Sequence, residues 1–177
     1  MSTEYKDEEK FGSFNEAGIL DGFYGQGFNI NKSLLETIGN SVDACATEIK
    51  FLNKKKYIYC IDNGYGMTKE QCKDYTDAYK SNHGNDKSIG KYGIGGKIAT
   101  IYASNKTLVV IYTKNVEDTY LKIIIPWQEM YKEGKYTGMI SIKNQEEKEI
   151  KLFNHHLPNK RGTIIEYLFN EDLEKAI

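Results

Sequence analysis

Three clusters of polar residues and glycines, all between residues 36 and 97, constrain the fold of this chain more than any other feature. They follow in this order: Glu36, Asn40, Asp43 and Ala44; then Asp62, Gly64, Gly66 and Met67; and last Gly90, Lys91, Tyr92, Gly93, Ile94, Gly95, Gly96 and Lys97. Each cluster alone is a weak pattern. Their order, spacing and chemistry suit one pocket, so we expect the fold to bring the three segments together.

The first cluster predicts a helix with one chemical face. At about 100° per residue, Glu36, Asn40 and Asp43 fall within an arc of about 60°. An amide oxygen at Asn40 suits Mg²⁺, which prefers hard oxygen ligands, and a carboxylate one turn away at Glu36 can deprotonate a water aimed at a terminal phosphate. The remaining side carries an apolar stripe that we expect to pack on the protein: Leu35, Ile38, Val42 and Cys45. Taken alone, the pattern is also typical of an ordinary amphipathic helix with a solvated polar face.

The second cluster places a carboxylate at the end of a strand. Residues 57–61 are rich in β-forming side chains and lead into Asp62, after which Gly64 and Gly66 let the backbone turn sharply and approach a flat ligand. A carboxylate there can accept a hydrogen bond from an exocyclic amine such as that of adenine, and Met67 offers polarizable packing against a ring. The alternative is a plain turn, because Asp-Asn-Gly is a common turn sequence.

The third cluster is a glycine loop that departs from two familiar nucleotide motifs. Lys91 stands where a P-loop has its first glycine, and Ile98 stands where Ser or Thr would bind magnesium. Ile98 also replaces the third glycine of the dinucleotide fingerprint after Gly93 and Gly95. We expect a flexible run that opens a helix, whose free N–H groups and positive dipole end suit phosphate, with Lys97 and Lys91 nearby. A glycine-rich hinge is the alternative.

Together the three clusters resemble the GHKL superfamily, which includes gyrase-type topoisomerase subunits, heat-shock chaperone ATPases, sensor histidine kinases, MutL repair proteins and MORC ATPases. The resemblance covers residues 33–168. It implies an α+β fold, a two-layer sandwich of the Bergerat type in which a mixed, mostly antiparallel sheet backs helices around a nucleotide pocket. Residues 40–47 look closest to the MutL, MORC and type II topoisomerase branches.

The resemblance also implies a role for each cluster in binding ATP and Mg²⁺. Glu36 would be the general base, Asn40 the magnesium ligand, Asp62 the adenine anchor, and the glycines of residues 90–96 the phosphate-binding loop. A Gly-Thr pair leading into a late strand would add Thr163 beside the adenine anchor. Histidine kinases usually carry an amide residue at the position of Glu36, so the carboxylate favours hydrolysis over phosphotransfer.

Composition bounds the class of protein. The chain has 177 residues and is 40% hydrophobic, which suits one globular domain with its own core. Lys and Arg number 24 against 25 Asp and Glu, so the net charge does not indicate a DNA partner, although a local basic patch stays open. Cys45, Cys60 and Cys72 lack a CxxC pairing, which favours reduced thiols and an intracellular location, cytoplasmic or nuclear. No apolar run approaches bilayer length, so we expect a soluble protein without a membrane partner.

Periodicity predicts the elements. Residues 1–31, rich in glycines and aromatics, predict an irregular N-terminal arm, and residues 32–177 an ATP-binding domain that would be an excised part of a longer protein or would rely on a partner. We expect helices from residue 31 or 33 to 45, at 69–79 and from the glycine run to 102, and strands at 47–52, 57–61, 108–112, 120–125, 138–143 and 163–168. Residues 80–88 read as a mobile loop and residues 145–149 as a solvated turn, with His155 and His156 in a polar turn.

The hypothesis that follows is a magnesium-dependent ATPase with slow turnover. ATP would close a lid at residues 79–89 and drive homodimerisation within a larger machine acting in DNA topology, repair or chromatin. A transducer domain or a partner chain would supply a lysine or arginine to the γ-phosphate. Two alternatives stay open: a nucleotide-binding regulatory module without useful turnover, and phosphotransfer to a histidine as in the kinases. A structural α/β domain without activity is the third.

Overall fold

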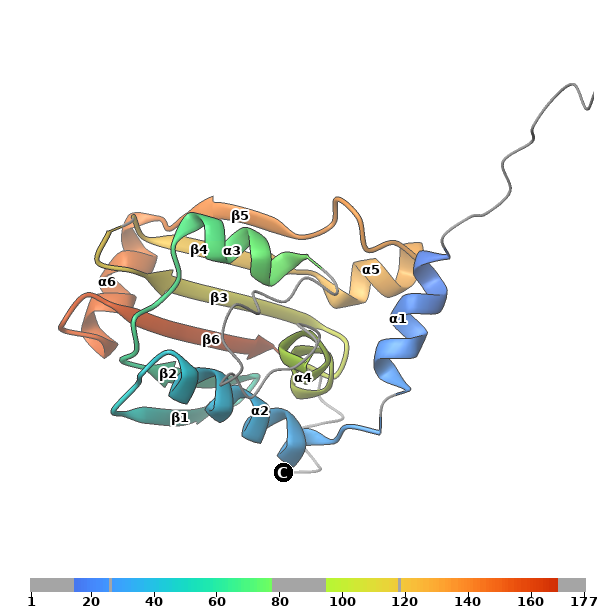
Figure 1. The fold of residues 1–177 in the computed structure, drawn as a ribbon, viewed down its shortest axis with the longest axis horizontal. Helices are drawn as coiled ribbons and strands as arrows, with labels where there is room; N and C mark the ends of the chain where they lie inside the picture. The colour runs from blue at the N-terminus through green and yellow to red at the C-terminus, as the bar shows by residue number, and fades with distance from the viewer. Residues whose placement is uncertain (1–14, 26, 78–94, 118, 169–177) are drawn as a thin grey trace, which may run out of the picture.

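A six-stranded sheet with helices packed on it forms the body of the protein (Figure 1). The computed structural model describes residues 15–25, 27–77, 95–117 and 119–168. The strands are β1 (Ile49–Lys54), β2 (Tyr57–Asp62), β3 (Leu108–Lys114), β4 (Leu121–Ile125), β5 (Ser141–Asn144) and β6 (Gly162–Leu168). They lie in the order β1-β2-β6-β3-β4-β5, and all five pairings are antiparallel. The predicted α+β sandwich with a mostly antiparallel sheet is therefore confirmed.

Six helices accompany the sheet in the described part of the chain. They are α1 (Glu16–Tyr24), α2 (Ile30–Asp43), α3 (Lys69–Thr76), α4 (Gly95–Ala103), α5 (Trp127–Glu133) and α6 (Glu147–His156). None of them is long and apolar enough to cross a membrane. The predicted start of α3 is confirmed, because the Thr68 side chain caps it in a capping box with Gln71. The predicted start of α2 at residue 31 or 33, either of which could cap the helix, is wrong: the cap is Asn29, whose side chain accepts a hydrogen bond from the backbone N–H of Lys32.

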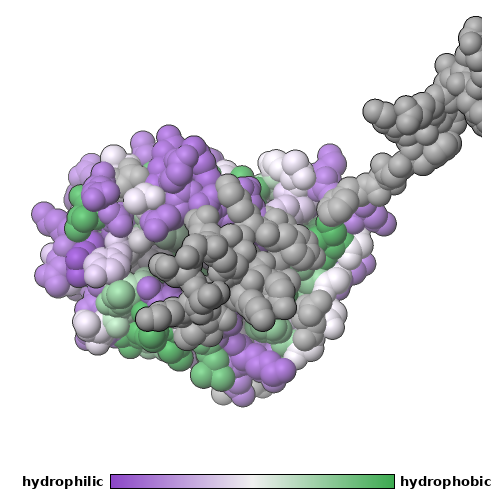
Figure 2. Space-filling view, in the orientation of Figure 1, coloured by the Kyte–Doolittle hydropathy of each residue, from purple (hydrophilic) through white to green (hydrophobic). Residues whose placement is uncertain are grey.

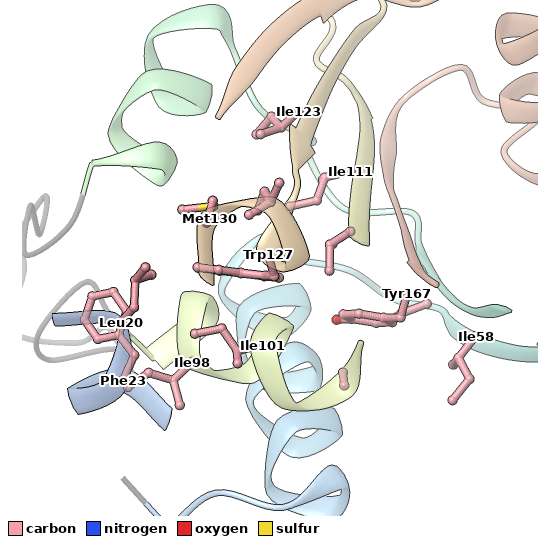
Figure 3. Close-up of a cluster of buried hydrophobic side chains, with 14 of the residues drawn as sticks. Leu20, Phe23, Ile58, Ile98, Ile101, Ile111, Ile123, Trp127, Met130 and Tyr167 are labelled. Carbon is pink, nitrogen blue, oxygen red and sulfur yellow. The ribbon is translucent and has the colours of Figure 1, made fainter. Parts of the chain in front are cut away.

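The main core lies between the sheet and its helices (Figure 3). Every second residue of the central strands faces this layer, as Ile111 and Ile123 do, since side chains alternate along a strand. Ile98 and Ile101 of α4 enter it from the helical side. Trp127 of α5 is fully buried there and donates from its indole nitrogen to Thr100 Oγ1 at 3.1 Å. α5 was absent from the sequence expectation, and its burial explains how a short helix is held.

α1 is part of this core, whereas the sequence predicted an irregular arm. Leu20 and Phe23 are each 1% exposed and pack with the other core residues. The Glu16 carboxylate accepts hydrogen bonds from the backbone N–H groups of Tyr136 and Thr137. These bonds hold the start of α1 against the segment that follows α5. The irregular-arm prediction is thus wrong for residues 16–24. The division into an arm of residues 1–31 and a domain of residues 32–177 stays a prediction.

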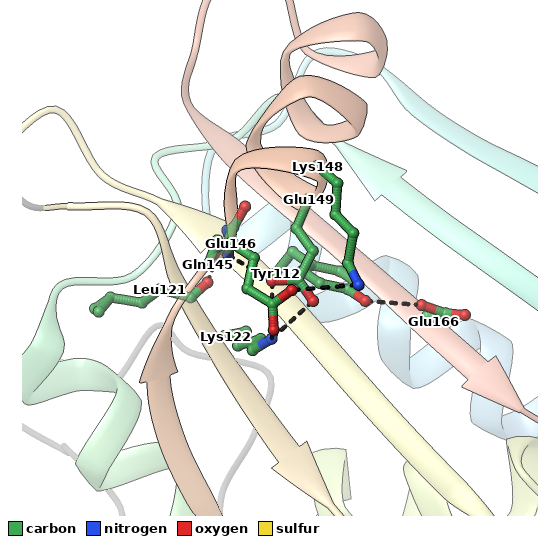
Figure 4. Close-up of polar contacts among 8 residues, drawn as sticks. All are labelled: Tyr112, Leu121, Lys122, Gln145, Glu146, Lys148, Glu149 and Glu166. Carbon is green, nitrogen blue, oxygen red and sulfur yellow. Dashed lines mark hydrogen bonds and ion pairs between the residues drawn. The ribbon is translucent and has the colours of Figure 1, made fainter.

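α6 covers part of the opposite face of the sheet. Its Phe153 and Leu157 pack on Ile61 and Ile164, which alternate with the residues that face the main core. At its start, Lys122 lies between the carboxylates of Glu149, at 2.7 and 2.8 Å, and Glu146, at 3.7 Å (Figure 4). The prediction of a solvated turn at residues 145–149 is wrong, because Glu146 and Glu149 form the capping box of this helix. His155 and His156 are its last turn.

Candidate functional site

Asp62 is the buried centre of the candidate site. It ends β2, is 4% exposed, and accepts hydrogen bonds from Ser41 Oγ at 3.1 Å and from the backbone N–H of Gly64 at 2.9 Å. Thr163 lies directly opposite on β6. Burial raises the pKa of Asp62, and the hydrogen bonds from Gly64, Ser41 and the Thr163 backbone act in the other direction. These three donors do not exhaust the acceptor sites of an ionised carboxylate, which leaves capacity for a ligand N–H.

The backbone after Asp62 passes so close to its neighbours that glycine is required. Gly66 has a φ of 68°, and a Cβ there would overlap the Lys114 carbonyl oxygen. A Cβ on Gly64 would lie 2.7 Å from the carbonyl oxygen of Ala44, at the end of α2. Met67 follows, donates its N–H to Thr113 Oγ1 at 2.8 Å, and packs against the main core. The turn therefore brings the second cluster against the last residue of the first.

The polar face of α2 lies against the start of α4. A Cβ on Gly95 would overlap Glu36 Oε1, and a Cβ on Gly96 would lie 3.2 Å from Asn40 Nδ2. Burial raises the pKa of Glu36, and the negative charge of Asp43 raises it further. The predicted grouping of Glu36, Asn40 and Asp43 is thus what the structure has, and the glycines at the start of α4 are what let the two helices approach.

The same helix corrects the prediction about its buried side. Ser33, Thr37 and Ser41 are the buried residues of α2, and Thr37 Oγ1 lies 2.8 Å from the Tyr167 hydroxyl of β6. By contrast, Leu35 is 66% and Val42 53% exposed. Cys45 is also exposed, with a positive φ just after the helix. The predicted burial of the stripe is therefore wrong for Leu35, Val42 and Cys45, whereas Ile38 is partly buried. Small hydroxyl side chains make the contact of α2 with the sheet instead.

Lys97 does not lie in the open. It is 3% exposed, its ammonium lies 5.3 Å from the centre of the Tyr75 ring, and burial lowers its pKa to about 8, with Asp77 acting in the other direction. Tyr75 also lies near Glu36, whose charge is one of the causes that raise the Tyr75 pKa, after burial. The lysine therefore contacts the end of α3, at the boundary of the segment that leads to the glycine run.

Most of the predicted site residues lie together at one end of the sheet, around Asp62 and the contact of α2 with α4. Gly90, Lys91, Tyr92, Gly93 and Ile94 lie outside the described residues. Two neighbours of the site were missed by the sequence reasoning. They are Ser41, which bonds to Asp62, and Tyr75, which contacts both Lys97 and Gly96. The four-residue spacing of Ser33, Thr37 and Ser41 was the available signal for a hydroxyl-lined helix face.

Comparison with known protein families decides the family. Residues 28–163 match the family described as histidine kinase-, DNA gyrase B-, and HSP90-like ATPase. The chain belongs to this family. The match covers most of the chain and includes all three clusters, so the GHKL assignment from the sequence is confirmed at the level of the superfamily. No curated protein matches the chain. Within this histidine kinase-, DNA gyrase B-, and HSP90-like ATPase family, ATP binding and ATPase activity are the general properties.

Proposed function

We propose that this protein binds ATP together with Mg²⁺ and hydrolyses the ATP slowly, with Glu36 as the general base. The observation that carries the proposal is the contact of Glu36 and Asn40 with Gly95 and Gly96, which puts an acid and an amide at the start of α4. A helix start presents free N–H groups and a partial positive charge, which suit phosphate. Family membership supports ATPase activity in general.

Adenine recognition falls to Asp62 and Thr163 in this proposal. The Asp62 carboxylate is buried and already ordered by Ser41 and Gly64, so it can accept a hydrogen bond from the adenine amine without losing flexibility on binding. The tight turn at Gly64 and Gly66 keeps side chains away from the flat base. An isolated buried carboxylate is costly, and a ligand donor offsets part of that cost.

In this proposal, α2 and α4 bind the phosphates and Mg²⁺. The donor set fits the ion: Asn40 has an exposed amide, and its oxygen with phosphate oxygens would give the hard ligands that Mg²⁺ prefers. When bound, Mg²⁺ neutralises charge on the phosphates. We assign the phosphate contacts to the glycine run, Gly90 to Gly96, with Lys97 and Lys91 as nearby cations.

Hydrolysis needs one proton transfer. Glu36 takes a proton from the attacking water as the water oxygen bonds to the γ-phosphorus; the bond from that phosphorus to the bridging oxygen breaks, and ADP and phosphate leave. Burial and the charge of Asp43 raise the pKa of Glu36, which makes its carboxylate a stronger base. Asp62 takes no part in this step.

The wider role follows from the family resemblance. We propose that a lysine or arginine from another domain or chain contacts the γ-phosphate, that ATP drives dimerisation, and that the assembly acts in DNA topology, repair or chromatin, as in the MutL, MORC and topoisomerase branches. The predicted lid, residues 79–89, lies outside the described residues, and its closure stays a prediction.

Two variants test the proposal. Glu36→Gln keeps the shape of the side chain beside Gly95, so calorimetry should find ATP analogue binding within about threefold of wild type, whereas phosphate release should fall at least about a hundredfold. Asp62→Asn should weaken analogue binding about tenfold or more, because an amide cannot accept from both Ser41 and Gly64. Glu133→Gln, an exposed residue at the end of α5, is the control and should change neither.

The outcomes separate the alternatives. Unchanged turnover in Glu36→Gln would remove Glu36 as the base. Tight Mg²⁺-dependent binding to the wild type with no phosphate release would favour the regulatory module. Phosphate transfer to a histidine of a partner chain would favour a kinase.

A further inference from the structure

β1 is an edge strand of the sheet in the part of the chain that the structure describes. It pairs only with β2 among the strands that the structure describes, and it lies at one end of the sheet order (Figure 1). The Asn63 N–H donates to the Glu48 carbonyl at 3.3 Å, and a two-residue turn follows Lys54, so the even-numbered residues of this strand bond to β2. The N–H and C=O groups of Ile49, Phe51 and Asn53 therefore point outward. Such an edge is a template for pairing with another strand.

An exposed apolar surface lies beside this edge. Leu35 and Val42 of α2 are 66% and 53% exposed, and they lie on the side of the helix turned away from Glu36. Phe51 of β1 is 39% exposed on the same face of the sheet. Figure 2 shows hydrophobic residues gathered along the lower part of the molecule, where α2 and β1 lie in Figure 1. A surface of this kind next to an open strand edge is typical of a contact with another protein.

We propose that β1 pairs antiparallel with β1 of a second copy, centred on Phe51, in a homodimer that forms without nucleotide. The two sheets then continue into one another, and α2 of each copy lies beside α2 of the other, so that Leu35 and Val42 are covered. This interface is isologous, because the same surface serves both copies. It goes beyond the proposed ATPase function and leaves the Glu36 side of α2 open.

Charge complementarity selects the occupant and the register. Opposite residues in an antiparallel pair share a face, so a centre at Phe51 places Glu48 opposite Lys54 of the second copy, twice by symmetry. Phe51 then faces Phe51 of the second copy in a pair whose outward N–H and C=O groups bond to each other. Centres at Leu52 or Asn53 instead place Lys50 opposite Lys54 or Lys56, which puts like charges together. A centre at Ile49 would also oppose unlike charges, Glu48 and Lys50, but it would pair β1 with residues 44–48, which precede the strand. The Phe51 register is thus the one that opposes unlike charges along the whole of β1.

Charge reversal and its rescue test the interface by sedimentation without nucleotide. The wild type should be a dimer, and Lys54→Glu should raise the dimer dissociation constant at least about tenfold, because two glutamates then oppose each other at both ends. The double variant Glu48→Lys with Lys54→Glu should recover most of the affinity. Lys55→Glu, the same charge change in the turn, is the control and should leave the dimer intact.

A disulfide tests the register. In a Cys45→Ser background, Phe51→Cys should form a dimer on a non-reducing gel, since opposed Cα atoms lie about 5.5 Å apart, within the range a disulfide spans. Asn53→Cys, on the same face, should not, because the two copies of residue 53 would lie about 14 Å apart. A wild type that is monomeric at every soluble concentration, or that dimerises only with ATP, overturns the proposal. An equal loss of dimer affinity in Lys54→Glu and Lys55→Glu also overturns the proposal, as does a disulfide-linked dimer of Asn53→Cys.

Discussion

At the scale of single residues, Asp62 joins three segments of the chain. Its two carboxylate oxygens accept from Ser41 on α2 and from Gly64 in the turn, while its backbone lies so close to Gly162 that a Cβ there would overlap the Asp62 carbonyl oxygen. Gly162 has a φ of 127°, which side chains rarely adopt. The proposed adenine anchor is therefore also a structural connection between α2, β2 and β6.

A methyl group at Gly95 should disturb catalysis through Glu36. In Gly95→Ala the new Cβ would overlap Glu36 Oε1, so the carboxylate must move. We expect the rate of phosphate release at saturating ATP to fall at least about tenfold, since displacing a catalytic group by about 1 Å can lower the rate that much. Gly22→Ala, in the middle of α1 with open space around it, is the control and should raise stability by about 0.5 to 1 kcal/mol without changing the rate. A Gly95→Ala enzyme with a normal rate would argue against Glu36 as the base.

The acid limb of the pH profile should report Glu36. Its pKa is raised by burial and by Asp43, and a base works only when deprotonated, so the rate should fall as pH drops through that pKa. Asp43→Asn removes the second cause, lowers the Glu36 pKa, and should move the acid limb of kcat to lower pH. Glu129→Gln, exposed on α5, should leave the limb in place. An unmoved limb in Asp43→Asn would assign it to another group.

At the scale of elements, α2 shows what sequence periodicity can and cannot supply. The pattern located the helix and grouped Glu36 with Asn40, because spacing along a helix fixes direction around its axis. It chose the wrong buried side, because an apolar stripe indicates a contact without saying whether the core or another protein makes it. The helix contacts the sheet through Ser33, Thr37 and Ser41. Their hydroxyls donate to backbone carbonyls four residues earlier, and those of Thr37 and Ser41 also bond to side chains of the sheet.

Elements held by long-range contacts escaped the sequence reasoning. α5 depends on the burial of Trp127. α1 depends on Leu20 and Phe23, and the Phe23 ring meets that of Tyr136, about a hundred residues further along the chain. α6 looked like a charged turn because its first residues are glutamates and lysines. Only the sheet shows that Lys122, from β4, is the partner of Glu149. Local propensity carries none of this information.

The start of α6 offers a matched comparison of ion pairs. Glu149 pairs with Lys122 at 2.7 Å, with side chains 15% and 10% exposed, whereas Glu147 pairs with Lys151 at the same distance with side chains 84% and 73% exposed. Glu149→Gln should cost roughly 2 kcal/mol of unfolding free energy, less than a fully buried pair because Glu146 stays near Lys122. Glu147→Gln should cost less than about 0.5 kcal/mol. Urea denaturation measures both, and equal costs would contradict the role of burial.

At the scale of the whole molecule, ligand binding should raise the free energy of unfolding and the Tm. ATP with Mg²⁺ at about a hundred times the dissociation constant should add about 2.7 kcal/mol, which corresponds to roughly 5 to 10 °C in Tm for a chain of this size. Glu36→Gln should keep this shift and Asp62→Asn should lose most of it, measured at equal ligand concentration. A Tm shift that survives in Asp62→Asn would place the adenine-binding site elsewhere.

The polar seat of α2 has a thermal consequence. Burial of apolar surface carries a large heat-capacity change, so contacts made by leucine or valine weaken as temperature falls. In the contact of α2 with the sheet, the fully buried positions instead carry hydroxyl groups, which pair at Thr37 with Tyr167 and at Ser41 with Asp62. We expect this contact to contribute little to the heat-capacity change of unfolding. The spacing between Glu36 and the start of α4 should therefore vary little with temperature, so the Arrhenius plot of turnover should stay straight in the cold.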